Sequence, residues 1–169
     1  MSLYEKAWQA VESRIANAAR EAGRNPSDVR LLAVSKTFAA DAIRGVHACG
    51  HRAFGENYVQ ELVEKQKQLP GDIQWHFIGH LQTNKVKYIA PFISVIQAVD
   101  SLKLLKEIHQ QASRHQRVIS VLLQVRIARE ATKSGLSEEE LLDLLNSKQL
   151  AEYTGASLTG LMGMATNTA

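Results

Sequence analysis

The chain has 169 residues, 45% of them hydrophobic, which is enough for one folded domain and argues against disorder. Its formal charge is +3 at pH 7, and its basic residues are dispersed, so composition gives little support to nucleic-acid binding. The single cysteine, Cys49, excludes an internal disulfide framework and is typical of a reducing compartment. Neither a leader-like apolar segment nor a membrane-length run is present, so we expect a cytoplasmic protein.

Apolar periodicity predicts one helix followed by alternating strands and helices. Apolar residues spaced by three and four predict the first helix over residues 4–22, and the turn signals of Gly23 and Asn25-Pro26 end it. The predicted strands cover residues 30–34, 51–54, 74–78, 93–98, 118–125 and 157–164. The predicted helices between them cover residues 40–48, 58–68, 84–90, 102–116 and, after a capping box at Ser137 and Glu140, 138–145.

This alternation predicts an α/β fold in which helices cover a parallel sheet, because the strands are mostly uninterrupted apolar runs. Two architectures fit, a doubly wound sheet and a (β/α)8 barrel. An eight-unit barrel takes about 250 residues, so this chain supplies roughly five and a half units. No linker or low-complexity segment divides the sequence, and we expect a single domain over residues 1–169.

A single lysine ends the first predicted strand. The apolar residues 31–34 lead directly into Ser35-Lys36-Thr37, which places one primary amine at the carboxyl end of a buried strand. Withdrawal from water lowers the pKa of a lysine amine and frees its lone pair for imine chemistry. The alternative is a solvated lysine at a strand terminus, since long charged side chains mostly reach water.

Polar side chains follow the other predicted strands as well. Because the carboxyl ends of parallel strands share one rim, we expect these side chains to converge there. An amine, an imidazole and two amides around one mouth would suit an aromatic aldehyde with a phosphate tail. The segments that reach this rim after the second to sixth strands are Gly55-Glu56-Asn57-Tyr58, residues 79–85, Asp100-Ser101, residues 126–133 and Gly163-Met164.

Each member of this rim also has a structural explanation. Asn57 taken alone is better explained as the cap of the helix that begins at Tyr58, and Asn84 fits a cap in the same way. His80 fits a hydrogen-bonded loop histidine. Glu56 is explained as the ion-pair partner of a neighbouring lysine.

The spacing of His47, Cys49 and His51 resembles a metal cluster but does not support one. Positions two apart on a helix do not face each other, and no fourth ligand follows at a matching distance. We therefore expect no metal site. The sequence also has no glycine-rich nucleotide loop and no Ser-His-Asp order that stands out, so it gives no support to a nucleotide-binding or hydrolase site.

Four motifs stand in a fixed order along nearly the whole chain. They are Ala33-Val34-Ser35-Lys36, Phe54-Gly55-Glu56-Asn57-Tyr58-Val59-Gln60-Glu61, Trp75-His76-Phe77-Ile78-Gly79-His80-Leu81-Gln82 with Asn84-Lys85, and Gly160-Leu161-Met162-Gly163-Met164. In order and spacing they resemble the pyridoxal phosphate homeostasis proteins, small relatives of the alanine racemase barrel. The resemblance implies a (β/α)8 TIM barrel, here covering about six strands, with pyridoxal 5'-phosphate (PLP) held as an imine on Lys36. It also places Asn57 and His80 at the cofactor rim and Met162 near the ring.

The resemblance further implies a role in intracellular PLP, or vitamin B6, balance without catalytic turnover and hence no catalytic residues. Racemisation needs a second proton-transfer group on the opposite face of the ring, which racemases take from another domain. The alternatives are a PLP-dependent racemase or lyase, and a binding module for protein or nucleic acid that uses the basic surface. The implied partners are the cofactor and enzymes that accept it, without nucleic acid or membrane, for a monomer or weak dimer.

Two features depart from the family pattern. The family usually carries Gln-Val-Asn in the fifth strand, whereas this chain has Gln124-Val125-Arg126, which brings a permanent charge to the rim. The family also continues into two phosphate-binding segments, whereas this sequence ends at residues 166–169. We expect either a part of a longer protein or a shortened form that has open edges at its first and sixth strands and retains the cofactor weakly.

Overall fold

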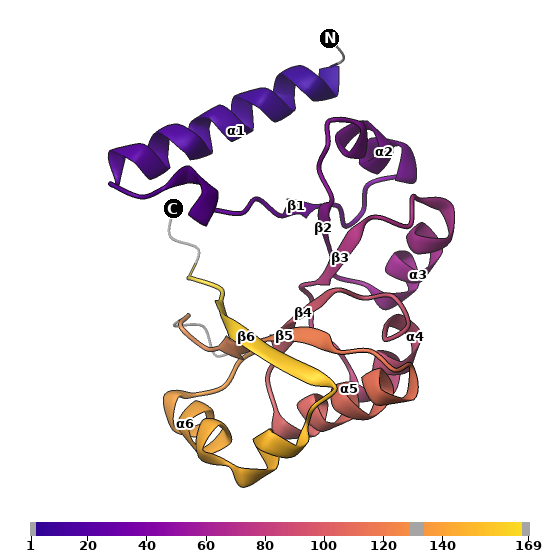
Figure 1. The fold of residues 1–169 in the computed structure, drawn as a ribbon, viewed down its shortest axis with the longest axis vertical. Coiled ribbons are helices and arrows are strands. Elements are labelled where there is room, and N and C mark those ends of the chain that lie inside the picture. The colour runs from indigo at the N-terminus through magenta and orange to yellow at the C-terminus, as the bar shows by residue number, and fades with distance from the viewer. Residues whose placement is uncertain (1–2, 129–133, 167–169) are drawn as a thin grey trace.

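The fold, described by a computed structural model over residues 3–128 and 134–166, is built on one parallel sheet (Figure 1). Six strands pair in the order β1-β2-β3-β4-β5-β6, so each strand lies beside its successor in sequence. This order is that of a (β/α)8 barrel and differs from a doubly wound sheet, in which the strand order reverses. The strands are β1 (Ala33–Val34), β2 (Ala53–Glu56), β3 (Gln74–Phe77), β4 (Val95–Val99), β5 (Ile119–Val125) and β6 (Ala156–Gly163).

Helices connect the strands, and α2 to α5 lie along the same side of the sheet (Figure 1). In the part of the chain described, β1 and β6 each pair with one neighbour only, so the barrel is not closed. No helix within this part is long and apolar enough to cross a membrane. The helices are α1 (Leu3–Glu21), α2 (Ala40–Ala48), α3 (Val59–Gln68), α4 (Val86–Ile89), α5 (Leu102–Arg114) and α6 (Glu138–Asn146), with 3-10 turns η1 (Pro26–Asp28), η2 (Thr83–Lys85) and η3 (Lys148–Glu152).

The hydrophobic core fills the space between the sheet and these helices. Phe54 of β2 and Phe77 of β3 are buried, as are Val121 and Leu123 of β5 and Ile108 of α5. Because side chains alternate across a strand, the residues between these core positions point to the opposite face of the sheet. The sheet therefore has an apolar helix side and a more polar second side.

Several predicted boundaries shift in the structure. The first strand is only Ala33–Val34, shorter than the predicted 30–34, and the second runs from Ala53 to Glu56 rather than 51–54. Pairing explains both shifts, because the β1–β2 register matches Ala33 with Phe54 and Val34 with Gly55. Tertiary pairing, not local propensity, sets these ends.

The helix predicted over residues 84–90 divides into η2 and α4. Asn84 lies inside η2, and neither element has a side-chain cap, so the cap interpretation of Asn84 is wrong. The capping box before α6 is confirmed. The Ser137 N–H donates to Oε2 of Glu140 at 2.8 Å, and the Glu140 N–H donates to Oγ of Ser137 at 3.2 Å.

Polar groups occupy the side of the sheet opposite the helices. His76 lies between the core residues Trp75 and Phe77, so its ring faces this second side, where Nε2 of Gln97 lies 2.9 Å from its Nδ1. Burial lowers the pKa of His76, and the nearby His51 lowers it further. Burial is also the largest cause of the lowered pKa of His51.

Acidification should therefore destabilise the fold. The pKa values of His76 and His51 are lowered in the folded chain, so the unfolded chain binds more protons than the folded chain below about pH 6.5. The free energy of unfolding therefore decreases as the pH is lowered. Urea unfolding between about pH 7.5 and pH 5 measures this slope. His76→Gln should flatten it, whereas the exposed His115→Gln should not. An unchanged slope in His76→Gln would contradict the assignment.

Candidate functional site

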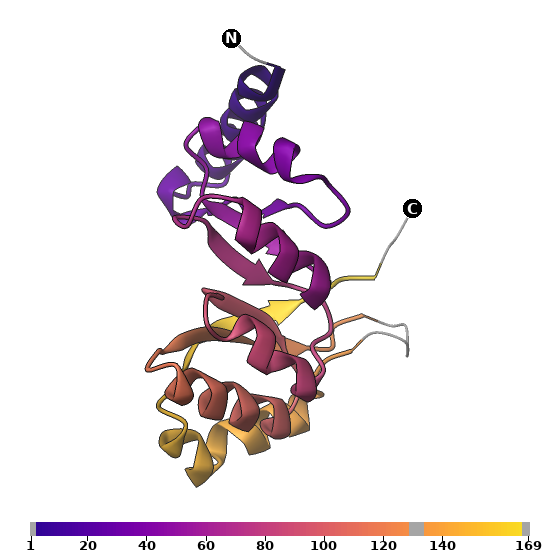
Figure 2. The same cartoon turned by 90° about the vertical axis from the view of Figure 1, so that its right-hand side faces the viewer.

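The candidate site lies at the carboxyl end of the sheet. Because all six strands are parallel, the loops after them emerge at one end. Figure 2 shows this end on the right, where the purple loop after β1 and the yellow tip of β6 both point. Lys36, Asn57 and His80 follow β1, β2 and β3 and so share this end of the sheet.

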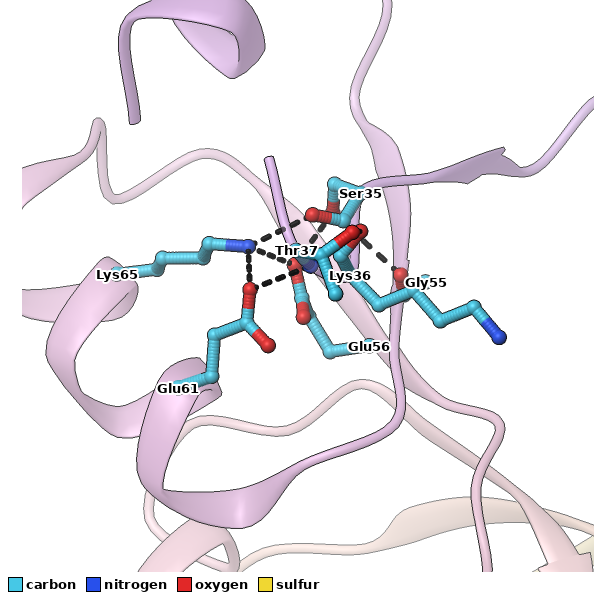
Figure 3. Close-up of polar contacts among 7 residues, drawn as sticks. All are labelled: Ser35, Lys36, Thr37, Gly55, Glu56, Glu61 and Lys65. Atoms are coloured by element: carbon cyan, nitrogen blue, oxygen red, sulfur yellow. Dashed lines mark hydrogen bonds and ion pairs between the residues drawn. The ribbon is translucent and has the colours of Figure 1, made fainter. Parts of the chain in front are cut away.

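Lys36 stands two residues beyond β1 with its side chain exposed. Among the described residues, its Nζ makes no hydrogen bond or ion pair. In Figure 3 the side chain extends away from the neighbouring charged groups of Glu56, Glu61 and Lys65. We expected this amine to be withdrawn from water, and that expectation is wrong for the described residues: the Lys36 side chain is exposed to solvent.

The residue before Lys36 is held firmly. Ser35 is buried, and its N–H donates to the carbonyl of Gly55 at 2.9 Å, which continues the pairing of β1 with β2. Its hydroxyl donates to Oε1 of Glu56 at 2.6 Å. Nζ of Lys65 in α3 donates to the Ser35 carbonyl at 2.7 Å. These contacts from β2 and α3 hold the backbone immediately before Lys36 in place.

The residue after Lys36 is held as well (Figure 3). Thr37 has a left-handed backbone with φ of 66°, a conformation that β-branched residues rarely adopt. Its N–H donates to Oε1 of Glu61 at 2.7 Å, and its hydroxyl donates to the Lys36 carbonyl at 2.6 Å. The chain thus turns sharply after Lys36, and a side chain from α3 stabilises the turn.

Asn57 and His80 line one hollow of about 270 Å³ beyond β2 and β3. Asn57 is not the cap of α3, because Tyr58 occupies the N-cap position. The N-cap has no side-chain hydrogen bond to the helix. Oδ1 of Asn57 is instead buried without a hydrogen-bond partner in the structure as described. Nδ1 of His80 lies 3.4 Å from Oδ2 of Asp100, so this loop histidine faces a carboxylate beyond β4.

Met162 and Arg126 lie elsewhere. Met162 belongs to β6, where it pairs in register with Gln124 of β5, and neither Met162 nor Lys36 is among the residues that line the hollow. Arg126 is exposed, and its backbone N–H donates to the Leu136 carbonyl at 2.9 Å. The rest of the predicted fifth rim segment, residues 129–133, falls outside the described residues. The structure thus brings Asn57 and His80 together, with Lys36 and Met162 at the two edge strands.

Glu56 turns toward the helices. Its Oε1 accepts from Nζ of Lys65 at 2.7 Å, which confirms its interpretation as the partner of a neighbouring lysine. Sequence reasoning missed both Lys65 and Glu61. The available signal was their spacing of four residues on a predicted helix, which places the two side chains on one face.

His47, Cys49 and His51 make hydrogen bonds to other groups. Among the described residues, no group of three or more His, Cys, Asp or Glu side chains could hold a metal ion. The contacts are His47 Nε2 to Asp72 Oδ1 at 2.7 Å, Cys49 Sγ to the Gly45 carbonyl at 3.3 Å, and His51 Nε2 to the Ala53 carbonyl at 2.6 Å. Hydrogen bonding by His47 is the largest cause of the lowered pKa of Asp72.

Close backbone contact joins the loops that carry Asn57 and His80. A Cβ atom added at Gly79 would lie 2.5 Å from the Asn57 carbonyl oxygen and 2.8 Å from its Cα. Both neighbours are backbone atoms and cannot rotate away. Any side chain at this position must push the two loops apart.

Gly79→Ala should therefore displace Asn57 and lower the free energy of unfolding by about 1–3 kcal/mol, the usual cost of overpacking. Denaturant unfolding measures the change. Gly71→Ala is the matched control, because a Cβ there meets nothing within 4 Å. Equal stability of the two variants would show that the loops separate without cost.

Comparison with known proteins identifies relatives of this chain and of its fold. Residues 8–168 match the family model of the alanine racemase N-terminal domain. The pyridoxal phosphate homeostasis protein of Pseudomonas aeruginosa is 42% identical over 160 residues, which cover 94% of this chain and 69% of that protein. PipY of Synechococcus elongatus, solved without and with PLP bound, has TM-scores of 0.78 and 0.75 at 34% identity, covering 92% of this chain and 72% of PipY.

A more distant likeness concerns the fold alone. Alanine racemase of Bartonella henselae has a TM-score of 0.60 at 14% identity, over 78% of this chain and 37% of that one. The present chain spans about two thirds of the length of its curated relatives, from 65% to 73% of the proteins compared.

Proposed function

Because this chain belongs to the family of the alanine racemase N-terminal domain, we propose that it binds pyridoxal 5'-phosphate and serves in PLP homeostasis. The 42% identity to a pyridoxal phosphate homeostasis protein and the likeness to PLP-bound PipY support this role. The observation that carries the proposal is the exposed amine of Lys36 on a firmly held turn at the carboxyl end of β1.

The residues present fit this cofactor. When bound, it supplies an aldehyde, which condenses with a primary amine and releases one water molecule. Lys36 offers such an amine, with no partner to displace among the described residues. The buried Oδ1 of Asn57 has no hydrogen-bond donor within residues 3–128 and 134–166, a costly arrangement that a bound molecule with a hydroxyl or N–H group would relieve.

The proposed roles of the individual residues rest on the resemblance of their motifs to the family. Lys36 carries the cofactor, Asn57 and His80 line its site, and Met162 stands near its ring. The single domain over residues 1–169 holds and releases the cofactor in the cytoplasm, and enzymes that accept PLP are its partners. The chain acts as a monomer or weak dimer.

A holding role without turnover is proposed from the likeness to the pyridoxal phosphate homeostasis proteins. Racemisation requires a proton donor and a proton acceptor on opposite faces of the bound amino acid. Lys36 supplies one amine, whereas the imidazole of His80 already faces the carboxylate of Asp100 at 3.4 Å. The likeness to the pyridoxal phosphate homeostasis proteins, and not the rim geometry, supports binding without turnover.

Covalent attachment should occur at Lys36. Mixing the chain with PLP should produce a new visible absorption band, and hydride reduction should fix the label on the peptide that contains Lys36. Lys36→Ala should lose about ten-fold or more of this label, because Lys65 is buried with its ammonium fully hydrogen-bonded, and exposed lysines such as Lys106 are ordinary surface amines. Lys106→Ala, at an exposed lysine of α5, is the control and should label normally. Equal labelling of Lys36 and Lys106 in the wild-type chain would refute the proposal.

Turnover should be absent. Incubation with PLP and L-alanine in deuterated water should exchange the α-proton no faster than free PLP does, as the likeness to the pyridoxal phosphate homeostasis proteins implies. Proton NMR of the amino acid measures the rate. Heat-denatured protein with the same PLP is the control. Exchange well above that control would assign the chain to the racemases or lyases instead.

A further inference from the structure

Lys65 occupies the centre of a buried polar cluster beside Lys36 (Figure 3). Only 7% of Lys65 is exposed, and its ammonium donates to the Ser35 carbonyl at 2.7 Å, to Oε1 of Glu56 at 2.7 Å and to Oε1 of Glu61 at 2.6 Å. An ammonium group has three protons, so these oxygens fill its donor capacity. We call Ser35, Glu56, Glu61 and Lys65 the Lys65 cluster.

Glu56 connects the Lys65 cluster to β1 and β2. It is fully buried, and its Oε1 accepts both the hydroxyl of Ser35 at 2.6 Å and the ammonium of Lys65. Ser35 follows β1, Glu56 ends β2, and Lys65 lies in α3. One carboxylate oxygen therefore sets the spacing of all three elements at the point where the site begins.

Glu61 extends the cluster to the far side of Lys36. Its Oε1 accepts from Lys65 and also from the N–H of Thr37 at 2.7 Å. The peptide before Lys36 thus reaches the ammonium through the Ser35 carbonyl, and the peptide after it does so through Glu61. Both peptide groups that flank Lys36 are held by the same buried charge.

We propose that the Lys65 cluster is a positioning device, which sets the direction in which Lys36 leaves the chain and so controls how fast its amine reacts with an aldehyde. This inference rests on the proposed function. The direction of a side chain is set by the backbone on either side of its Cα, and this is the part that the cluster holds. In Figure 3 the Lys36 side chain accordingly points away from the cluster.

The same contacts place Asn57. Glu56 immediately precedes Asn57, and its carboxylate is held by Ser35 and Lys65. The loops that carry the amine and the unpartnered amide oxygen therefore start from one shared anchor. Lys65 and Glu61 act on Lys36 only through the backbone on either side of it, so they are positioning residues.

Glu61→Ala tests the inference, because the side chain is 25% exposed and its removal deletes the acceptor for Thr37. Glu61→Gln keeps an acceptor oxygen for the Thr37 N–H and should therefore behave like the wild-type chain. Glu64→Ala is the control, since Glu64 lies on the same helix in an exposed ion pair with Lys67 at 2.8 Å. The first readout needs no cofactor: amide hydrogen exchange at Thr37 should accelerate in Glu61→Ala only.

The second readout is the rate at which PLP labels Lys36 under hydride reduction, followed by mass spectrometry. Glu61→Ala should slow this rate by about tenfold, since small misplacements of a reacting group cost one to two orders of magnitude. It should also weaken the visible circular dichroism of the bound cofactor. Glu61→Gln and Glu64→Ala should match the wild-type chain in both.

The outcomes separate this inference from the proposed function. If wild-type Lys36 takes no label, the proposed function fails and the inference falls with it. If the wild-type chain labels and Glu61→Ala labels equally fast with unchanged dichroism, the proposed function stands and the positioning role is wrong. Should Glu61→Ala not fold, Glu61→Asp serves instead, because it keeps the charge but shortens the reach to Thr37. Its labelling rate then decides in the same way.

Discussion

The buried ion pair of Lys65 and Glu56 is the interaction on which the site depends. β1 consists of two residues, too few for its ladder alone to fix the edge of the sheet. Lys65 and Glu56 add contacts from α3 and β2 to Ser35, the residue that follows this short strand. Removal of Lys65 would leave the fully buried carboxylate of Glu56 without its lysine partner, which is strongly destabilising.

The helix-covered face of the sheet and its carboxyl end differ in the groups that they carry. The helix side contains the apolar core and the Lys65 cluster, which together give rigidity. The carboxyl end presents the Lys36 amine and the hollow lined by Asn57 and His80. A reactive group can remain exposed and still be well placed, because the backbone that carries it is anchored on the buried side.

The likeness to alanine racemases shows how much of this arrangement is fold and how much is site. A sheet of parallel strands in sequential order brings every loop after a strand to one end, whatever the chemistry there. The function therefore depends on which groups the loops carry. In this chain the backbone contact of Gly79 with Asn57 and the hydrogen bond of Glu61 to Thr37 determine where those groups stand.

The sequence by itself determined the α/β class, the alternation of strands and helices, the capping box at Ser137 and the position of Lys36 beyond a strand. These features depend on periodicity and on contacts between close neighbours in the chain. Only the tertiary structure decided that Lys65 is the partner of Glu56, that Asn57 is not a cap, and that Lys36 is exposed. Lys65 and Ser35 are thirty residues apart, and packing across β1, β2 and α3 brings them together, which no local pattern encodes.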